Sequence, residues 1–249
     1  SERSLKKGKK LESIMNEAAQ GFSVVAAQTR TDADRLSQFG AGNIAVTGSV
    51  KFDITPQDEA VEKGKLLKKC IGNRPVLMCA STRDGEENLI LDALDHLDKR
   101  TLLLLVPRHP QRFSEVADQI QARKIRMMKR SQLQNLSSDI IPDDVRILLG
   151  DSMGEMFMYY ATCDVAFIGG SLLKLGGQNL IEACALGKPV LIGPHTFNFE
   201  AITKDAIEAG ATIRIQTAPE MMAEANKLFS HDSLRAEMGI KAQEFAQNQ

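Results

Sequence analysis

The chain has 249 residues, of which 43% are hydrophobic and 25% are charged, and its net charge at pH 7 is −1. This composition suits a globular protein with a sizeable core, and the near-zero charge argues against a dedicated nucleic-acid binder, which is usually strongly basic. The four cysteines form no C-x-x-C pair and have no histidine at zinc-finger spacing, so we expect free thiols in a reducing compartment. No apolar run approaches the length of a membrane span.

Apolar, β-rich segments alternate with amphipathic helical segments along the chain, and several of the apolar segments are continuously hydrophobic. This alternation predicts an α/β fold, a Rossmann-like doubly wound parallel sheet with helices on both faces. The predicted strands are residues 23–27, 43–47, 75–79, 101–106, 125–128, 145–149, 165–168, 189–192 and 212–215. The predicted helices are residues 58–69, 86–99, 112–123, 154–161, 178–186, 199–209, 219–229 and 233–247.

Residues 49–57 contain a proline and follow a glycine, as is typical of a linker. A short β-α-β piece precedes this segment, and a fresh series of β-α units follows it. We therefore expect two parts, with residues 1–52 forming the end of another domain and residues 53–249 a complete Rossmann-like domain. Because doubly wound sheets bind ligands beyond the carboxyl ends of their strands, the residues that follow strands are the candidates for a site.

The first such cluster holds Ser81 and Thr82, between a predicted strand and a predicted helix that starts at Glu86. Their hydroxyls and the free N–H groups of the helix N-terminus would suit an anion. The alternative is that Ser81, Thr82 or Asp84 caps the helix and that Glu86 or Glu87 favours its dipole. Taken alone, this cluster is explained by capping.

The second cluster holds Arg108 and His109, between Pro107 and Pro110 at the end of the most apolar strand. The two prolines restrict the backbone and hold both side chains at the strand end. An arginine there would grip a phosphate or carboxylate through two parallel hydrogen bonds. The alternative is a solvated arginine and a capping histidine.

The third cluster follows the strand at residues 145–149, where Asp151 and Ser152 suit a helix cap. The backbone amides from Ser152 to Gly154 would face a ligand, although a cap alone also accounts for these residues.

The fourth cluster has two glycine pairs, which let the backbone approach a phosphate closely and expose consecutive N–H groups. Asn179 and Glu182 are predicted to share one helix face, where a carboxylate would accept hydrogen bonds from both hydroxyls of a ribose. Neither a Walker A loop nor G-x-G-x-x-G is present, which disfavours a nicotinamide dinucleotide. Flexible turns beside a helix cap would explain the glycines but not Glu182. The cluster comprises Gly169, Gly170, Ser171, Gly176, Gly177, Gln178, Asn179 and Glu182.

The fifth cluster places His195, Thr196 and Asn198 after the strand at residues 189–192. These side chains would contact a bound sugar or nucleotide, and the alternative is a hydrogen-bonded structural histidine. Histidines, cysteines and carboxylates do not occur at metal-ligand spacing, so we expect neither a protein-bound metal nor a cofactor.

Taken together and in this order, the motifs closely resemble the 3-deoxy-D-manno-octulosonic acid (Kdo) transferase family. The resemblance implies a GT-B glycosyltransferase, in which two Rossmann-like domains face each other across a cleft and the C-terminal one holds the donor. Residues 53–249 would be that C-terminal domain and residues 1–52 a remnant of the N-terminal, acceptor-binding domain. The matching residues are 1–4, 48–53, 81–82, 85–87, 107–110, 167–171, 176–179, 182, 185–190 and 193–199.

The resemblance also implies the activity, which is transfer of Kdo from CMP-Kdo to a lipid A precursor (lipid IVA) in lipopolysaccharide biosynthesis. Such an enzyme works with inversion at the cytoplasmic face of the bacterial inner membrane. The missing N-terminal domain would supply the membrane anchor, the acceptor surface and the general base. We therefore expect this chain to be soluble and to bind CMP-Kdo without catalysing transfer.

By carry-over from the family, Arg108 and the Ser171 loop would meet the CMP phosphate or the Kdo carboxylate. Asn179 and Glu182 would take the phosphate and ribose side of CMP, and Ser81 and His195 would line the cleft.

The chain departs from the family at Gln178 and Arg83, where the family usually has histidines. Glutamine can form hydrogen bonds but cannot become cationic, which puts an electrostatic role of this position in doubt. The alternatives to a Kdo transferase are a GT-B transferase or epimerase that uses a UDP-sugar, and a non-catalytic nucleotide-binding module.

Overall fold

The computed structural model describes residues 8–27, 30–47 and 56–249. The chain divides into two compact units, Ser1–Asp53 with Gln249 and Ile54–Asn248. The domain border expected between residues 52 and 53, most of the expected linker, and the motifs at residues 1–4 and 48–53 lie outside the described residues.

The first unit contains the short β-α-β piece that the sequence predicts. Its strands β1 (Val25–Ala27) and β2 (Ile44–Val46) pair in parallel and are connected through α3 (Arg30–Ser37). The 3-10 helix η1 (Lys9–Leu11) and α2 (Glu12–Gln20) precede them and were not among the predicted helices. Several large apolar side chains of this unit are exposed, namely Leu11, Ile14, Met15, Phe22, Val24 and Val46.

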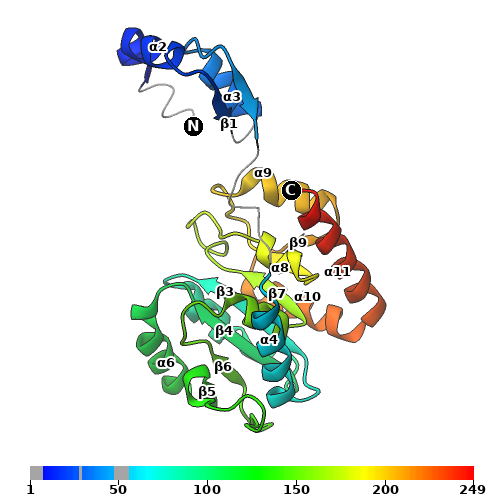
Figure 1. The fold of residues 1–249 in the computed structure, drawn as a ribbon. Helices are drawn as coiled ribbons and strands as arrows, with labels where there is room; N and C mark the ends of the chain where they lie inside the picture. Colours follow the sequence, from blue (N-terminus) through cyan, green and yellow to red (C-terminus); the bar gives the residue numbers. More distant parts are fainter. Residues whose placement is uncertain (1–7, 28–29, 48–55) are drawn as a thin grey trace. The chain divides into compact units, whose positions relative to one another are not determined.

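The second unit is built around a seven-stranded parallel sheet with the strand order β5-β6-β4-β3-β7-β8-β9 (Figure 1). The predicted Rossmann-like α/β fold is therefore confirmed. The strands are β3 (Val76–Thr82), β4 (Leu102–Pro107), β5 (Met127–Lys129), β6 (Ile147–Leu149), β7 (Val165–Ile168), β8 (Val190–Ile192) and β9 (Thr212–Arg214).

Helices cover both faces of this sheet, because alternate residues of a strand point to opposite faces and both sets are apolar. One hydrophobic core cluster joins one set of strand residues, such as Leu77 and Leu105, to residues of α5, α6 and α10. On the other face, α4 and α7 pack on each other, and α7 packs on β3. All four cysteines lie in the described residues and are buried free thiols. The helices are α4 (Asp58–Ile71), α5 (Glu86–Asp92), η3 (Leu94–His96), η4 (Pro110–Arg112), α6 (Phe113–Ala122), η5 (Arg130–Gln132), α7 (Met156–Thr162), α8 (Ile181–Ala185), α9 (Glu200–Glu208), α10 (Ala218–Ser230) and α11 (Asp232–Gln247).

The strand order determines where a ligand is expected. From β3 the chain continues outward through β4 on one side of the sheet, and β7 then returns to pair with β3 on its other side. The crevice beyond the carboxyl ends of β3 and β7 is thus the topological switch point, the usual ligand position in doubly wound sheets. Four of the five clusters found in the sequence follow β3, β4, β7 and β8, the four adjacent strands at this edge.

Candidate functional site

Ser81 lies near the end of β3 in a conformation that is rare for a residue with a side chain. Its φ is 54°, in the left-handed region, and the pairing of β3 with β4 shifts register between Ala80 and Thr82. A Cβ atom on Gly169, at the end of β7, would lie 2.7 Å from the Ser81 carbonyl oxygen, so glycine is required there. Left-handed conformations of this kind cost about 1–3 kcal/mol and cluster at functional sites.

Thr82, the other predicted hydroxyl, belongs to the scaffold of the site. It is fully buried, and its hydroxyl donates to Glu87 Oε1 at 2.9 Å. Its carbonyl accepts the backbone N–H of Arg108 at 2.9 Å, which ties the end of β3 to the end of β4. Glu87 also accepts from the Arg112 guanidinium at 3.1 Å, and burial raises the pKa of its carboxyl.

The capping interpretation of the first cluster is wrong, because the N-cap of α5 is Gly85, with a φ of 86°. Ser81 and Thr82 belong to β3 instead, and Asp84 binds the Arg112 guanidinium at 2.7 Å.

Glu86 occupies the centre of the switch point, a position that the sequence analysis missed. Its carboxylate is fully buried and accepts four backbone N–H groups. Oε2 accepts from Arg83 at 2.9 Å and from Gly170 at 2.6 Å. Oε1 accepts from Ser171 and Leu172, both at 2.9 Å.

The expectation that the amides of Gly170 and Ser171 are exposed for a phosphate is therefore wrong, because the Glu86 carboxylate already fills this cradle. The sequence does show a glutamate directly after Gly85, but the sequence analysis gave this glutamate only a favourable interaction with the helix dipole.

Ser171 connects the loops that follow β7 and β8. It is fully buried, and its hydroxyl donates to the Ile168 carbonyl at 2.5 Å and accepts from the Gly193 amide at 2.8 Å. Its own carbonyl accepts the backbone N–H of His195 at 3.0 Å. The hydroxyl is thus used inside the protein, and Ser171 positions the half-buried His195 through the backbone.

The second glycine pair allows protein loops to approach each other closely. The Gly177 amide donates to the Gly170 carbonyl at 2.7 Å, and the Asn198 amide donates to the Gly176 carbonyl at 3.0 Å. Gly176 has a φ of 95°, and a Cβ atom there would lie 2.1 Å from Asn198 Nδ2. These glycines let the loop after β7 fold back against the loop after β8.

Asn179 and Glu182 do not share a helix face, contrary to the prediction. Helix α8 begins at Ile181, and Asn179 stands before it with its side-chain oxygen accepting the Ile181 amide at 3.1 Å. The left-handed conformations of Gly176 and Gly177 keep this segment out of a helix. Gln178 lies against Gly170, with its Nε2 atom 3.3 Å from the place of a Cβ there.

Arg108 and Glu182 remain as charged side chains that the scaffold does not use. Arg108 is exposed and Glu182 is half-buried, and neither side chain forms a hydrogen bond or ion pair with the described residues. Burial raises the pKa of the Glu182 carboxyl, and the nearby Arg108 opposes this effect. The same two residues influence the pKa of the buried Tyr160, so all three lie within electrostatic range of one another. His109, beside Arg108, is half-buried and precedes η4 as its N-cap.

The third cluster forms a polar network of its own. The N-cap of α7 is Glu155, so the expectation that Asp151 or Ser152 caps this helix is wrong. Asp151 instead accepts from the backbone and side chain of Ser131 at 2.8 and 2.6 Å. Ser152 donates to Glu155, and Gly154 has a φ of 76° with open space at its Cβ position.

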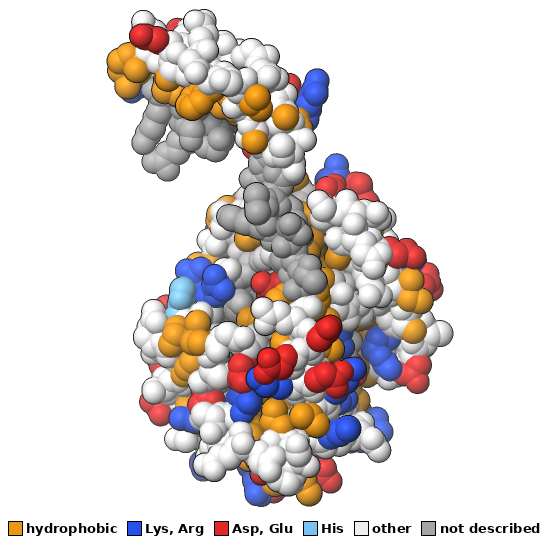
Figure 2. Space-filling model, in the orientation of Figure 1, with side chains coloured by type: hydrophobic (Ala, Val, Ile, Leu, Met, Phe, Trp, Pro, Cys, Tyr) orange, Lys and Arg blue, Asp and Glu red, His pale blue; other side chains and the backbone are white. Residues whose placement is uncertain are grey.

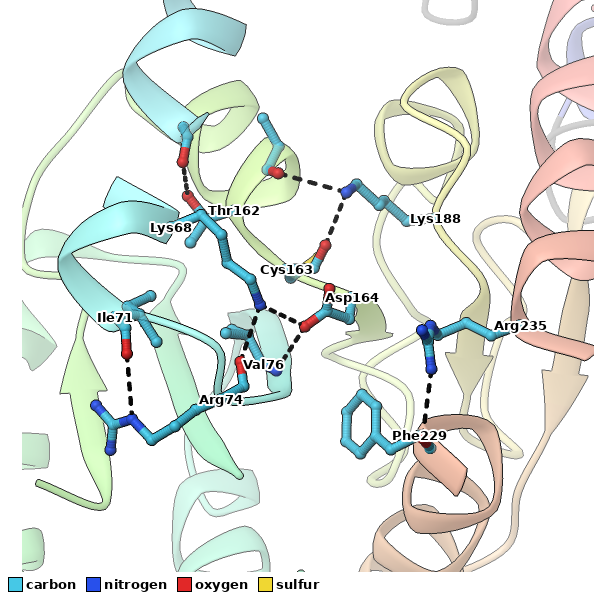
Figure 3. A network of polar contacts seen from close by, with 12 residues as sticks. Lys68, Ile71, Arg74, Val76, Thr162, Cys163, Asp164, Lys188, Phe229 and Arg235 are labelled. Atoms are coloured by element: carbon cyan, nitrogen blue, oxygen red, sulfur yellow. Dashed lines mark hydrogen bonds and ion pairs between the residues drawn. The ribbon is translucent and has the colours of Figure 1, made fainter. Parts of the chain in front are cut away.

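Cavities also open at the opposite, amino edge of the sheet, away from the clusters described above. A cavity of 590 Å³ opens at the amino ends of β3 and β7, where Asp164 accepts from Lys68 Nζ at 2.6 Å and from the Val76 amide at 2.8 Å (Figure 3). Lys188 donates there to the Cys163 carbonyl at 2.7 Å. These polar groups satisfy one another, which is the pattern of a structural network. Figure 2 shows charged side chains of both signs interspersed over the visible face of the second unit.

Among the described residues, histidines, cysteines and carboxylates form no group of three or more that could hold a metal ion. None of the helices described is both long and apolar enough to cross a membrane.

Two family models match the chain. Residues 1–54 match "3-Deoxy-D-manno-octulosonic-acid transferase (kdotransferase)", and residues 88–245 match "Glycosyl transferases group 1". Among curated proteins, the 3-deoxy-D-manno-octulosonic acid transferase of Bordetella pertussis is 43% identical over 245 residues, which are 96% of this chain and 56% of that protein. The transferase of Haemophilus influenzae is 35% identical over 210 residues, which are 82% of this chain and 48% of that protein. The chain spans about half the length of these relatives.

Solved structures agree with the fold. The C-terminal CMP-Kdo binding domain of WaaA from Acinetobacter baumannii matches with a TM-score of 0.71 and 31% identity, over 77% of this chain and 100% of that one. HepE from Anabaena, in complex with UDP and glucose, matches with a TM-score of 0.56 and 20% identity, over 96% of this chain and 62% of that one. These likenesses confirm the predicted fold of a GT-B glycosyltransferase half.

Proposed function

The chain belongs to the Kdo transferase family, and we propose that its second unit binds the donor CMP-Kdo at the carboxyl edge of β3, β4 and β7. One observation carries this proposal. At the switch point, the exposed Arg108 guanidinium is near enough to the half-buried Glu182 carboxylate to lower its pKa, and neither group forms a hydrogen bond or ion pair with the described residues. The matching C-terminal CMP-Kdo binding domain from A. baumannii supports the same ligand.

Glu182 would bind the ribose of CMP. A carboxyl whose pKa is raised by burial is destabilised in its charged form until hydrogen-bond donors reach it. Two neighbouring ribose hydroxyls supply such donors, and a carboxylate accepts both. The site thus gains most from a ligand that carries a diol.

Arg108 would bind the anionic groups of the donor. CMP-Kdo carries a phosphate and a carboxylate, and arginine binds either group through two parallel hydrogen bonds. Because Glu86 already occupies the amides of the loop after β7, the positive charge for the phosphate comes from a side chain. Arg108 would also stabilise the negative charge that develops on CMP as it leaves.

The complete reaction would be transfer of Kdo to a hydroxyl of a lipid A precursor, lipid IVA, in lipopolysaccharide biosynthesis. The acceptor hydroxyl attacks the anomeric carbon of Kdo, the bond to the phosphate oxygen breaks, and CMP leaves. We expect the half of the relatives that this chain does not span to supply the acceptor site, the general base and the contact with the inner membrane. His195, Ser81 and His109 would line the donor side.

A nucleotide titration tests the proposal. The chain is titrated with CMP, UMP and AMP by calorimetry and by NMR, with a circular dichroism spectrum to show that it is folded. We expect selective binding of CMP, with a Kd of about 1 mM, which is a binding free energy of about −4 kcal/mol, because the chain spans about half the length of its relatives. A preference for UMP would favour a UDP-sugar enzyme, and a folded chain that binds none of the three would contradict the proposed site.

A further inference from the structure

Glu86 has an arrangement that a helix-capping role does not require. Its two carboxylate oxygens accept four backbone N–H groups from two segments that are distant in sequence, the turn at Arg83 and the loop from Gly170 to Leu172. The side chain is completely buried. Converging backbone amides of this kind form the cradles that bind phosphates and other anions in proteins.

The place of this cradle is also the place of a ligand. In doubly wound sheets, the anionic part of a nucleotide binds at the switch point, next to the amides of the first turn after a strand. Here Glu86, a residue of the protein itself, supplies the anion between β3 and β7.

Hydrogen bonds connect this cradle to both charged residues of the proposed site. On one side, the Gly170 carbonyl accepts the Gly177 amide at 2.7 Å, in the loop that leads into α8 and Glu182. On the other side, Arg83 follows Thr82, whose carbonyl holds the Arg108 amide at 2.9 Å. A change at Glu86 would therefore move Arg108 and Glu182 relative to each other.

We propose that Glu86 is a positioning residue for the donor: its carboxylate permanently fills the anion position of the switch point, and the donor phosphate binds Arg108 instead of the loop amides. The proposal rests on the proposed function for the identity of the donor. The role requires a carboxylate, because four N–H groups need two accepting oxygens. A glutamine offers one such oxygen and directs its own N–H groups at the amides.

Chemical rescue tests the cradle directly. In Glu86→Ala, the atoms removed beyond Cβ correspond to those of acetate, so acetate is the probe. We expect the variant to bind CMP at least tenfold more weakly than the wild type, and acetate to restore the affinity with saturation. The amide signals of Gly170, Ser171 and Leu172 should shift together as acetate binds. Glu87→Ala is the matched control, because Glu87 is equally buried and binds Thr82 and Arg112, and acetate should leave these three amides unchanged there.

Two results would overturn the proposal. One is a folded Glu86→Ala chain that binds CMP as the wild type does, and the other is a variant whose three amides do not respond to acetate. If wild type binds no CMP, the proposed function fails, whereas the amide shifts with acetate still report on the cradle.

If the Glu86→Ala variant does not fold, the wild-type chain can be tested with two ligands, CMP and cytidine. CMP and cytidine differ by the phosphate alone. We expect the phosphate-dependent shifts at Arg108, with the amides of Gly170, Ser171 and Leu172 unchanged between the two ligands. Phosphate-dependent shifts at those amides would mean that the donor displaces Glu86, and the proposal would be wrong.

Discussion

Arg108 lies close enough to Glu182 to lower the pKa of its carboxyl, although the larger effect of burial raises it. The two residues come from different β-α units, since Arg108 follows β4 and Glu182 stands in the first turn of α8. Because Arg108 and Glu182 do not form an ion pair with each other, both remain available to a ligand. Arg108 suits an anionic group of that ligand, and Glu182 suits a diol.

Replacing Arg108 with alanine should weaken CMP binding without unfolding the chain. A hydrogen bond between charged groups contributes about 1.5–3 kcal/mol, so we expect a loss of about tenfold to a hundredfold in affinity. Arg100→Ala is the matched control, because Arg100 stands just before the same strand and pairs with Asp98 at the opposite end. Calorimetric titration should show the control within about twofold of wild type. Equal losses in both variants would argue against the site.

Replacing Glu182 with glutamine should stabilise the chain at neutral pH. The folded-state pKa of Glu182 is raised above its ordinary 4.5, so folding favours the neutral form. The stability that belongs to the protonated carboxyl is present below pH 4.5 and is lost as the pH rises through the folded pKa. Thermal unfolding between about pH 4 and pH 8 should thus show a higher Tm for Glu182→Gln at pH 7 and no difference below pH 4.5.

The control for this profile is Glu59→Gln, because Lys63 lowers the pKa of Glu59 and its charge is favoured in the folded state. It should give a small change of the opposite sign at neutral pH. Despite its higher Tm, Glu182→Gln should bind CMP more weakly than wild type, which a change that only improved stability would not do.

Ser81 and Lys124 are the described non-glycine residues with positive φ, at 54° and 56°. Glycine adopts this conformation without steric cost, so Ser81→Gly and Lys124→Gly should each raise the free energy of unfolding by about 0.5–1 kcal/mol. Ser81 lies at the switch point, whereas Lys124 is exposed after α6. Denaturant titration checks the stability, and we expect CMP affinity to fall in Ser81→Gly alone.

Gly169→Ala should destabilise the second unit. The new Cβ atom would lie 2.7 Å from the Ser81 carbonyl oxygen and 2.8 Å from that of Ala80, and a backbone cannot yield as a flexible side chain can. We expect a loss of about 1–3 kcal/mol. The control is Gly42→Ala, where the Cβ position has no neighbour within 4 Å. Equal denaturant midpoints for the two variants would contradict the close approach of β3 and β7.

Asp164→Asn should lower stability without changing CMP binding, because Asp164 lies at the amino edge of the sheet, away from the proposed site. Its carboxylate accepts from Lys68 and from the Val76 amide, and both partners of the ion pair are only 30% exposed. We expect a loss of about 1–3 kcal/mol. Glu62→Gln removes an ion pair with Lys65 that is more than 60% exposed on both sides, and it should cost less than about 1 kcal/mol. A large loss of CMP affinity in Asp164→Asn would move the site toward the 590 Å³ cavity.

The sequence predicted the strands of the second unit within a few residues, but the helix ends less well. The predicted helix at residues 178–186 begins only at Ile181, because the preceding glycines adopt left-handed conformations. The pattern of apolar residues did not predict these conformations. The predicted helix at residues 86–99 ends at Asp92 and continues as η3. The spacing of apolar residues indicates which face of a helix or strand is buried, but it gives little information about where that helix or strand ends.

The role of the glycines at the strand ends was predicted wrongly from the sequence. Gly169 and Gly176 were expected to let a phosphate approach, yet they admit the Ser81 carbonyl and the Asn198 side chain. A phosphate and a group of the protein itself can each come this close only where the Cβ atom is missing. The glycines in the sequence therefore do not indicate which of the two binds there.

The sequence by itself determined the parallel α/β architecture and its family, because the period of apolar residues and the motifs at the strand ends are properties of neighbouring residues. Only the tertiary structure decided how the polar groups at those ends are paired. Glu86 binds the amides of Gly170, Ser171 and Leu172 because buried carboxylates and N–H groups must find partners. Which partners meet depends on β7 returning beside β3, and that strand order is not encoded in any local spacing.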